Sequence, residues 1–207
     1  MGHHSSDSNA KRLRWRRVRA LLASGLVLGV GSAITLAAWN DSEHGTATFT
    51  AGEFDIQGAE DGSTFTDHPT QGDAATLVFN VPAVDMVPGQ TVYAPFSVRT
   101  APGSVAGTAQ LTADSGNGTG LGQWLRYGVR SIDGTTCDAA SFAAGTVVVP
   151  SESALTVDAS SEQSLPADAG GQVNYCFAFT LPADTPNAAQ GAVLTAHWEF
   201  VGLSAGQ

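Results

Sequence analysis

Hydrophobic and polar positions alternate along most of the chain after residue 38, and this alternation predicts β-strands. The pattern is clearest at 173–181, where large apolar residues occupy every second position and polar or small residues lie between them. Residues 194–201 repeat it, with Trp198 and Phe200 on the apolar face. The predicted strands are 46–58, 75–83, 91–100, 106–115, 123–132, 144–150, 153–159, 172–182 and 192–203.

Helical periodicity is nearly absent from the same region, and only residues 137–145 are interpreted as a short helix. The glycine-rich stretch 114–124 is interpreted as a flexible connection between strands, because no lysine follows it to bind phosphate. Eight or nine strands in 169 residues favour an all-β fold. We therefore expect an antiparallel two-sheet sandwich of the jelly-roll kind.

The first 38 residues have a different pattern. The basic stretch KRLRWRRVR, residues 11–19, precedes a 19-residue apolar run without a charge at 20–38. This order is typical of an export signal, and the small residues Ala37 and Ala38 favour cleavage before Trp39. An uncleaved membrane anchor is the alternative, because about 20 apolar residues span a bilayer. The sequence thus predicts a signal peptide or transmembrane helix at 1–38 and an exported domain at 39–207.

Charge is divided unevenly between these two parts. The leader holds six of the nine basic residues, and only Arg99, Arg126 and Arg130 follow it. These three oppose eighteen acidic residues from Trp39 onward, so the exported part has a formal charge of −15. Such a surface repels phosphate backbones, which excludes a nucleic acid partner. The exported part also lacks lysine, which excludes lysine-linked isopeptide bonds.

Cys137 and Cys176 are the only cysteines, and both follow the leader. An oxidising environment outside the cell allows them to pair. We predict a structural disulfide that closes a loop of roughly 40 residues and stabilises the fold by about 4 kcal/mol.

Three stretches resemble a known family. AAWND at 37–41, TFTAGEFDI at 48–56 and LVFNVPAVDMVPGQTVYAPFSVRT at 77–100 are similar to the TasA and camelysin (CalY) family. In particular, the chain looks like the actinobacterial exported proteins with an alternate-type leader, and in this family a signal peptidase of the SipW type cuts the leader. The resemblance implies a secreted, cell-surface protein whose precursor lies in the cell membrane.

The resemblance further implies a jelly-roll domain and, in fibre formers, strand donation between subunits of a biofilm matrix. Here the donor would be residues 39–50, and its candidate residues are Trp39, Asn40, Asp41 and Phe49. The partner would be a second copy, joined head to tail into a homopolymer. The alternative is that the segment is the first strand of its own domain, with Phe49, Phe54 and Ile56 in the core.

Candidate chemistry is sparse. Camelysin-like proteins have been classed as metallopeptidases, but no HExxH occurs here, and we expect neither peptidase activity nor a cofactor. His197 and Glu199 are two apart on one strand face, and Asp61 and Asp67 lie in an acidic loop; no complete metal site can be named from them. A structural fibre subunit is the predicted function, and a monomeric adhesin or ligand-binding sandwich is the alternative.

Overall fold

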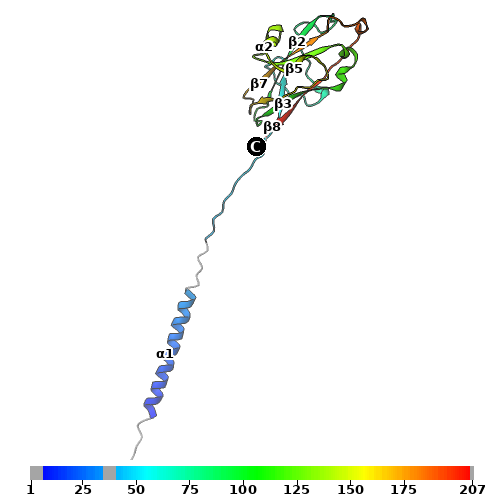
Figure 1. The fold of residues 1–207 in the computed structure, drawn as a ribbon. Coiled ribbons are helices and arrows are strands. Elements are labelled where there is room, and N and C mark those ends of the chain that lie inside the picture. Colours follow the sequence, from blue (N-terminus) through cyan, green and yellow to red (C-terminus); the bar gives the residue numbers. More distant parts are fainter. Residues whose placement is uncertain (1–6, 35–40, 206–207) are drawn as a thin grey trace, which may run out of the picture. The chain divides into compact units, whose positions relative to one another are not determined.

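The computed structural model describes residues 7–34 and 41–205, and the chain divides into two compact units between Phe49 and Thr50. In the N-terminal unit, α1 (Asp7–Ile34) spans the basic stretch and most of the apolar run (Figure 1). A search of the described residues finds no helix that combines the length and apolarity needed to cross a membrane. The predicted cleavage and donor residues Ala37, Ala38, Trp39 and Asn40 lie outside the described ranges.

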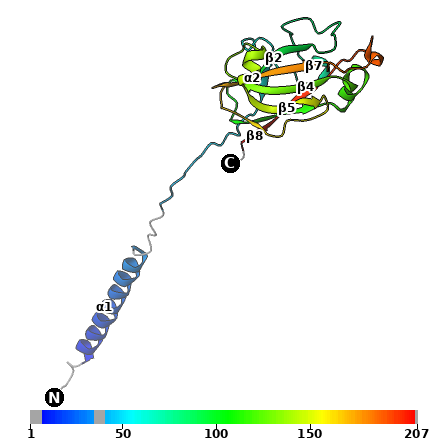
Figure 2. The ribbon, with the colours of Figure 1, turned by 45° about the horizontal axis from the view of Figure 1, so that its top comes forward.

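The C-terminal unit contains two antiparallel sheets. The larger has the strand order β1-β2-β7-β4-β5, and β2, β7, β4 and β5 lie side by side in Figure 2. Its members are β1 (Ile56–Ala59), β2 (Thr91–Thr100), β7 (Gln172–Thr180), β4 (Arg126–Ile132) and β5 (Thr146–Ala154). The smaller sheet has the order β6-β3-β8, with β6 (Gln163–Leu165), β3 (Gly107–Ala113) and β8 (Trp198–Ser204).

The two sheets pack against each other through aromatic side chains. Phe200 of the smaller sheet stacks on Phe96 with ring centroids 5.4 Å apart and lies 4.8 Å from the ring of Tyr175. Trp198 of the same sheet meets the ring of Phe177 edge-on, with ring centroids 5.9 Å apart. This core confirms a mostly β fold with two antiparallel sheets in a sandwich-like arrangement.

The outer face of the larger sheet carries a second, smaller core. Cys176 of β7 is fully buried and bonded to Cys137, whose Cα lies 5.2 Å away, so the predicted disulfide is confirmed. The predicted short helix is also confirmed as α2 (Ala139–Ala144). Its N-cap Asp138 accepts hydrogen bonds from the backbone of Ala140 and Ser141, which holds the helix start in place.

Several strand predictions were wrong. Residues 75–83 form no strand, and the predicted strand 46–58 is reduced to β1. β5 covers most of the strand predicted at 144–150 and continues past Pro150 through an irregularity in its pairing with β4, but it ends at Ala154, so residues 155–159 of the strand predicted at 153–159 form no strand. No strand was predicted at the position of β6, which is only three residues long.

The glycine-rich connection at 114–124 is a folded element. It forms two 3₁₀ helices, η2 (Ser115–Gly118) and η3 (Gly120–Gln123), around the buried side chain of Asn117. The Asn117 amide donates to the carbonyls of His197 and Leu155 and accepts from the His197 N–H. This clamp fixes the chain immediately before β8 begins at Trp198.

Candidate functional site: an open sheet edge

The segment that precedes the β unit is extended and exposed. Residues 41–53 are all exposed and include no helix or strand, and Phe49 is 92% exposed. Because Phe49 belongs to the N-terminal unit, the hypothesis that it lies in the core of its own domain stays a prediction. The stretch around this large apolar ring, residues 45–52, is uncharged.

Attachment to the domain begins at Glu53. The Glu53 carbonyl accepts from the N–H of Val105 at 2.8 Å, and the Asp55 carbonyl accepts from the N–H of Ala101 at 2.9 Å. The Asp55 N–H in turn donates to the buried hydroxyl of Ser104 at 2.9 Å. These bonds to the loop between β2 and β3 hold the chain to the domain from residue 53 onward.

Phe54 sits over two glycines of the smaller sheet. A Cβ atom placed on Gly107 would lie 2.4 Å from the Phe54 ring, and one placed on Gly202 would lie 2.9 Å from it. Because real Cβ atoms cannot approach so closely, only glycine at both positions leaves room for this ring. Phe54 and Ile56 are both half-buried here, and Ile56 packs on the main core and begins β1, whereas Phe54 precedes that strand.

The strand beside this ring, β8, has one unpaired edge. It pairs with β3 along its whole length, and no other described strand lies on its far side. Its inward residues Trp198 and Phe200 are only half-buried although they pack on the core, and Val201 and Leu203 on its outer face are exposed. The far edge therefore presents backbone N–H and C=O groups to which an additional strand could bond.

The other described sheet edges are better protected. β1 is covered on its outer side, since Gly58 and Thr66 exchange two backbone hydrogen bonds of 3.0 Å. β5 carries Pro150 and an irregular stretch in which Glu152 has a positive φ of 63°. β6 has three residues. β8 has seven residues, no proline and Glu199 as its sole charge, so it is the longest edge without one of these protections.

A second extended segment near β8 also lacks backbone partners. In residues 75–79, alternate side chains pack on the core, yet no backbone group of these residues bonds to another described residue. Phe79 lies 5.7 Å from the ring of Phe179, and Phe179 lies 5.2 Å from that of Trp198. Two unpaired stretches of backbone thus border the same aromatic part of the core.

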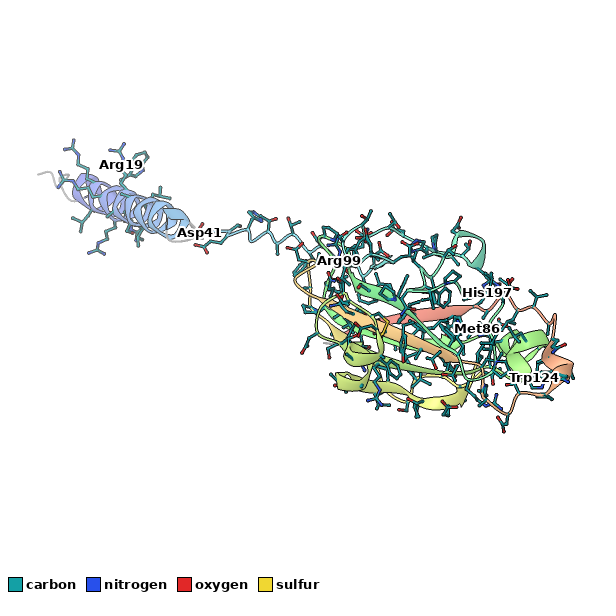
Figure 3. All side chains as sticks on the ribbon, turned by 90° about the horizontal axis from the view of Figure 1, so that it is seen from above. Arg19, Asp41, Met86, Arg99, Trp124 and His197 are labelled. Atoms are coloured by element: carbon teal, nitrogen blue, oxygen red, sulfur yellow. A yellow bond between two sulfur atoms is a disulfide. The ribbon has the colours of Figure 1, made fainter. Side chains whose placement is uncertain are left out.

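The acidic and histidine side chains considered as metal ligands are dispersed. His197 precedes β8 and lies towards one end of the β unit, whereas Arg99 lies towards the other (Figure 3). Asp67 belongs to the Arg99 end, because it accepts from Gln57, which also binds Arg99. Within the described ranges, no three His, Cys, Asp or Glu residues are close enough to hold a metal ion.

Asp61 is engaged in a turn of its own. Its carboxylate accepts from the backbone N–H groups of Thr64 and Ser63 and from both hydroxyls, and these bonds hold its pKa well below the usual range. The ordinary role of such an arrangement is to fix the loop.

Comparison with models of known protein families and with characterised protein sequences found no match for this chain.

Proposed function

We propose that the chain is a secreted, cell-surface structural protein whose subunits join by strand donation. In this proposal a signal peptidase of the SipW type removes residues 1–38, and residues 41–52 of one copy then add as a strand to β8 of the next. One observation carries the proposal: the same chain has an exposed, unpaired segment and an unprotected sheet edge.

The pattern of the donor suits this edge. In residues 46–51, Thr46, Thr48 and Thr50 alternate with Ala47, Phe49 and Ala51, so a strand formed here would have one polar and one apolar face. Paired with β8, the apolar face would follow the inward direction of Trp198 and Phe200. The added strand would complete the smaller sheet of a jelly-roll domain.

Charge and symmetry agree with a filament. The donor stretch 45–52 is uncharged and β8 carries one acid, so local repulsion is small although each exported domain has a formal charge of −15. Donor and acceptor are different surfaces, and a contact of this kind repeats head to tail into an open chain. The partner is therefore a further copy of this protein.

Cross-linking tests the contact directly. We would start the chain at Trp39 and place one cysteine in the donor, at Thr46, Thr48 or Thr50, and one on the outer face of β8, at Val201. A disulfide needs Cβ atoms about 4 Å apart, so only paired strands in register will link. We expect a ladder of covalent oligomers for one of these combinations.

Val147 provides the matched control. It is an exposed valine on β5, the open edge of the other sheet, with 47% exposure against 38% for Val201. Cysteines at Val147 should give no ladder with any donor position. A ladder through Val147, or none through Val201, would contradict the proposal.

Processing is tested separately by N-terminal sequencing of the exported protein, which should begin at Trp39. A chain that retains residues 1–38 would instead indicate the membrane anchor. The alternative function, a monomeric adhesin or ligand-binding module, is favoured by a cleft on the larger sheet that is described below. Size-exclusion chromatography and electron microscopy of the processed chain separate a monomer from a filament.

A further inference from the structure

The outer face of the larger sheet, on the side away from the main core, is hollowed by a cleft of about 200 Å³. Side chains and backbone from four strands and α2 surround it. The lining residues come from β2 (Thr91, Tyr93), β4 (Tyr127, Gly128), α2 (Phe142), β5 (Ser151, Glu152) and β7 (Ala178, Thr180).

Small residues form the floor. Gly128 and Ala178 are directly paired between β4 and β7, and Tyr93 of β2 is paired with Ala178 on its other side. A Cβ atom on Gly128 would lie 2.9 Å from the Cα of Ser151 and 3.2 Å from the ring of Phe142. Glycine is therefore required here by the two walls that rise on either side of it.

One wall is aromatic and held rigidly. The rings of Tyr93 and Phe142 lie 5.9 Å apart at an angle of 58°. Phe142 is positioned by the capped helix α2, and the adjacent disulfide between Cys137 and Cys176 fixes the start of that helix to β7. A half-buried ring on a rigid support offers an apolar surface, and it loses little side-chain entropy when a ligand binds.

The opposite wall and one end are polar. β5 has three residues between Val149 and Ser153 where β4 has one between Val129 and Tyr127, and the two extra residues bring Ser151 and Glu152 to the cleft. Glu152 has a left-handed backbone conformation, which is strained in a non-glycine residue. At the end of the cleft, the hydroxyls of Thr91 and Thr180 are hydrogen-bonded to each other at 2.8 Å.

We propose that this cleft binds one pyranose ring of a neutral carbohydrate. An aromatic ring beside a floor of small residues suits the C–H face of a sugar. The two hydroxyls on the rim can donate to and accept from sugar hydroxyls, and the carboxylate can accept from them. The volume lies below the range of about 300–1,000 Å³ typical of drug-sized ligands, which limits the ligand to a single ring.

An organic cation is the competing ligand, since Glu152 is the only charged residue of the lining. The surroundings disfavour it. The guanidinium of Arg130 already lies 5.1 Å from the centre of the Phe142 ring. Arg126 is paired with Thr180, so a second guanidinium belongs to the strand position next to the cleft. Both would repel a cation bound against the aromatic wall.

Ligand-observed NMR of the full chain tests the proposal. The probes are the methyl glycosides of glucose, galactose, mannose and N-acetylglucosamine, each up to about 10 mM because single-ring ligands bind weakly. We expect saturation transfer to at least one of them. Tyr93→Leu should weaken that binding about tenfold, as loss of an aromatic contact predicts, and Tyr93→Phe should retain it. Glu152→Gln should weaken it, whereas Glu162→Gln, an exposed glutamate outside the cleft, should leave it unchanged.

Thermal melting of each variant identifies any that fail to fold. If Tyr93→Leu fails to fold, Tyr93→Phe, which keeps the ring, is used in its place. Three results would overturn the proposal: no saturation transfer to any of the glycosides, equal binding by folded Tyr93→Leu, or displacement of a bound glycoside by tetramethylammonium. The last result would assign the cleft to cations.

Discussion

The sharpest consequence of strand donation concerns Phe49. This ring is 92% exposed in the subunit and would be buried against the core of the next copy. Fully burying a phenylalanine side chain contributes about 2–3 kcal/mol, and each 1.4 kcal/mol is a factor of ten in an equilibrium constant. Phe49→Ala should therefore raise the critical concentration for assembly about 30- to 140-fold.

The same change should leave the isolated subunit intact, because an exposed side chain contributes less than about 0.5 kcal/mol to folding. Sedimentation of the chain that starts at Trp39 gives the critical concentration, and thermal unfolding gives the subunit stability. Phe54→Ala is the matched control, since Phe54 is docked on Gly107 and Gly202 of its own domain. It should lower the melting temperature.

Two outcomes would refute this reasoning. If Phe49→Ala assembles at the concentration of the unchanged protein, the ring is not buried in the contact and donation by this segment is excluded. If it lowers the melting temperature as much as Phe54→Ala, Phe49 packs in its own domain, as the home-strand hypothesis holds.

The remaining predictions concern the folded subunit. Replacing Cys137 and Cys176 by serine should reduce the free energy of unfolding by about 4 kcal/mol in urea titrations, because their separation of 39 residues leaves a long loop open in the unfolded chain. Gly202→Ala should destabilise the subunit by about 1–3 kcal/mol, since the new methyl group would displace Phe54, and denaturant unfolding measures this loss. Burial raises the pKa of Tyr127 to about 12, and the charge of Asp158 also raises it. Burial raises the pKa of Tyr175 as well. Both phenols thus hold their protons more tightly in the folded state, so stability should fall as the pH rises above about 10, which phenolate absorbance and circular dichroism can follow together.

The strands were predictable where an alternating apolar pattern occurs in a segment that has a partner strand beside it in the sheet. Strand 91–100 was predicted with the bounds that β2 has, and the strand predicted at 172–182 became β7, Gln172–Thr180. Their apolar positions alternate, and in the sheet they are neighbours that satisfy each other's backbone. The disulfide was predictable for a simpler reason, since two cysteines admit one pairing.

Residues 75–83 show why other predictions failed. Their alternation is real, because alternate side chains from Ala75 to Phe79 pack on the core. Alternation reports which side chains are buried, and it carries no information on whether a neighbouring backbone is present to form a ladder. Pro150 misled in the opposite direction: it was read as the end of a strand, but the edge position of β5 lets the strand continue through an irregular stretch.

Neither candidate site could be located from the sequence. The open edge of β8 depends on which strand lies next to which, and such pairings join residues as distant as Gly107 and Ser204. The cleft combines residues from five elements, and its floor depends on the pairing of Gly128 with Ala178. The clamp on β8 was similarly hidden, because Asn117 lies in a stretch whose glycines suggested only a connection.

The two sites use different surfaces of the same sandwich, and this separation has a consequence for function. A strand added to β8 extends the smaller sheet at its edge, whereas the cleft opens on the outer face of the larger sheet, across the core from β8. Assembly would therefore leave the cleft accessible in every subunit, and a filament would present a row of identical weak sites. Because linked sites raise the effective concentration of one another, a polysaccharide that spans several subunits should bind filaments more tightly than it binds single subunits, while a methyl glycoside should bind both equally. Weaker binding of the methyl glycoside to filaments would mean that donation covers the cleft, and the two surfaces would then compete.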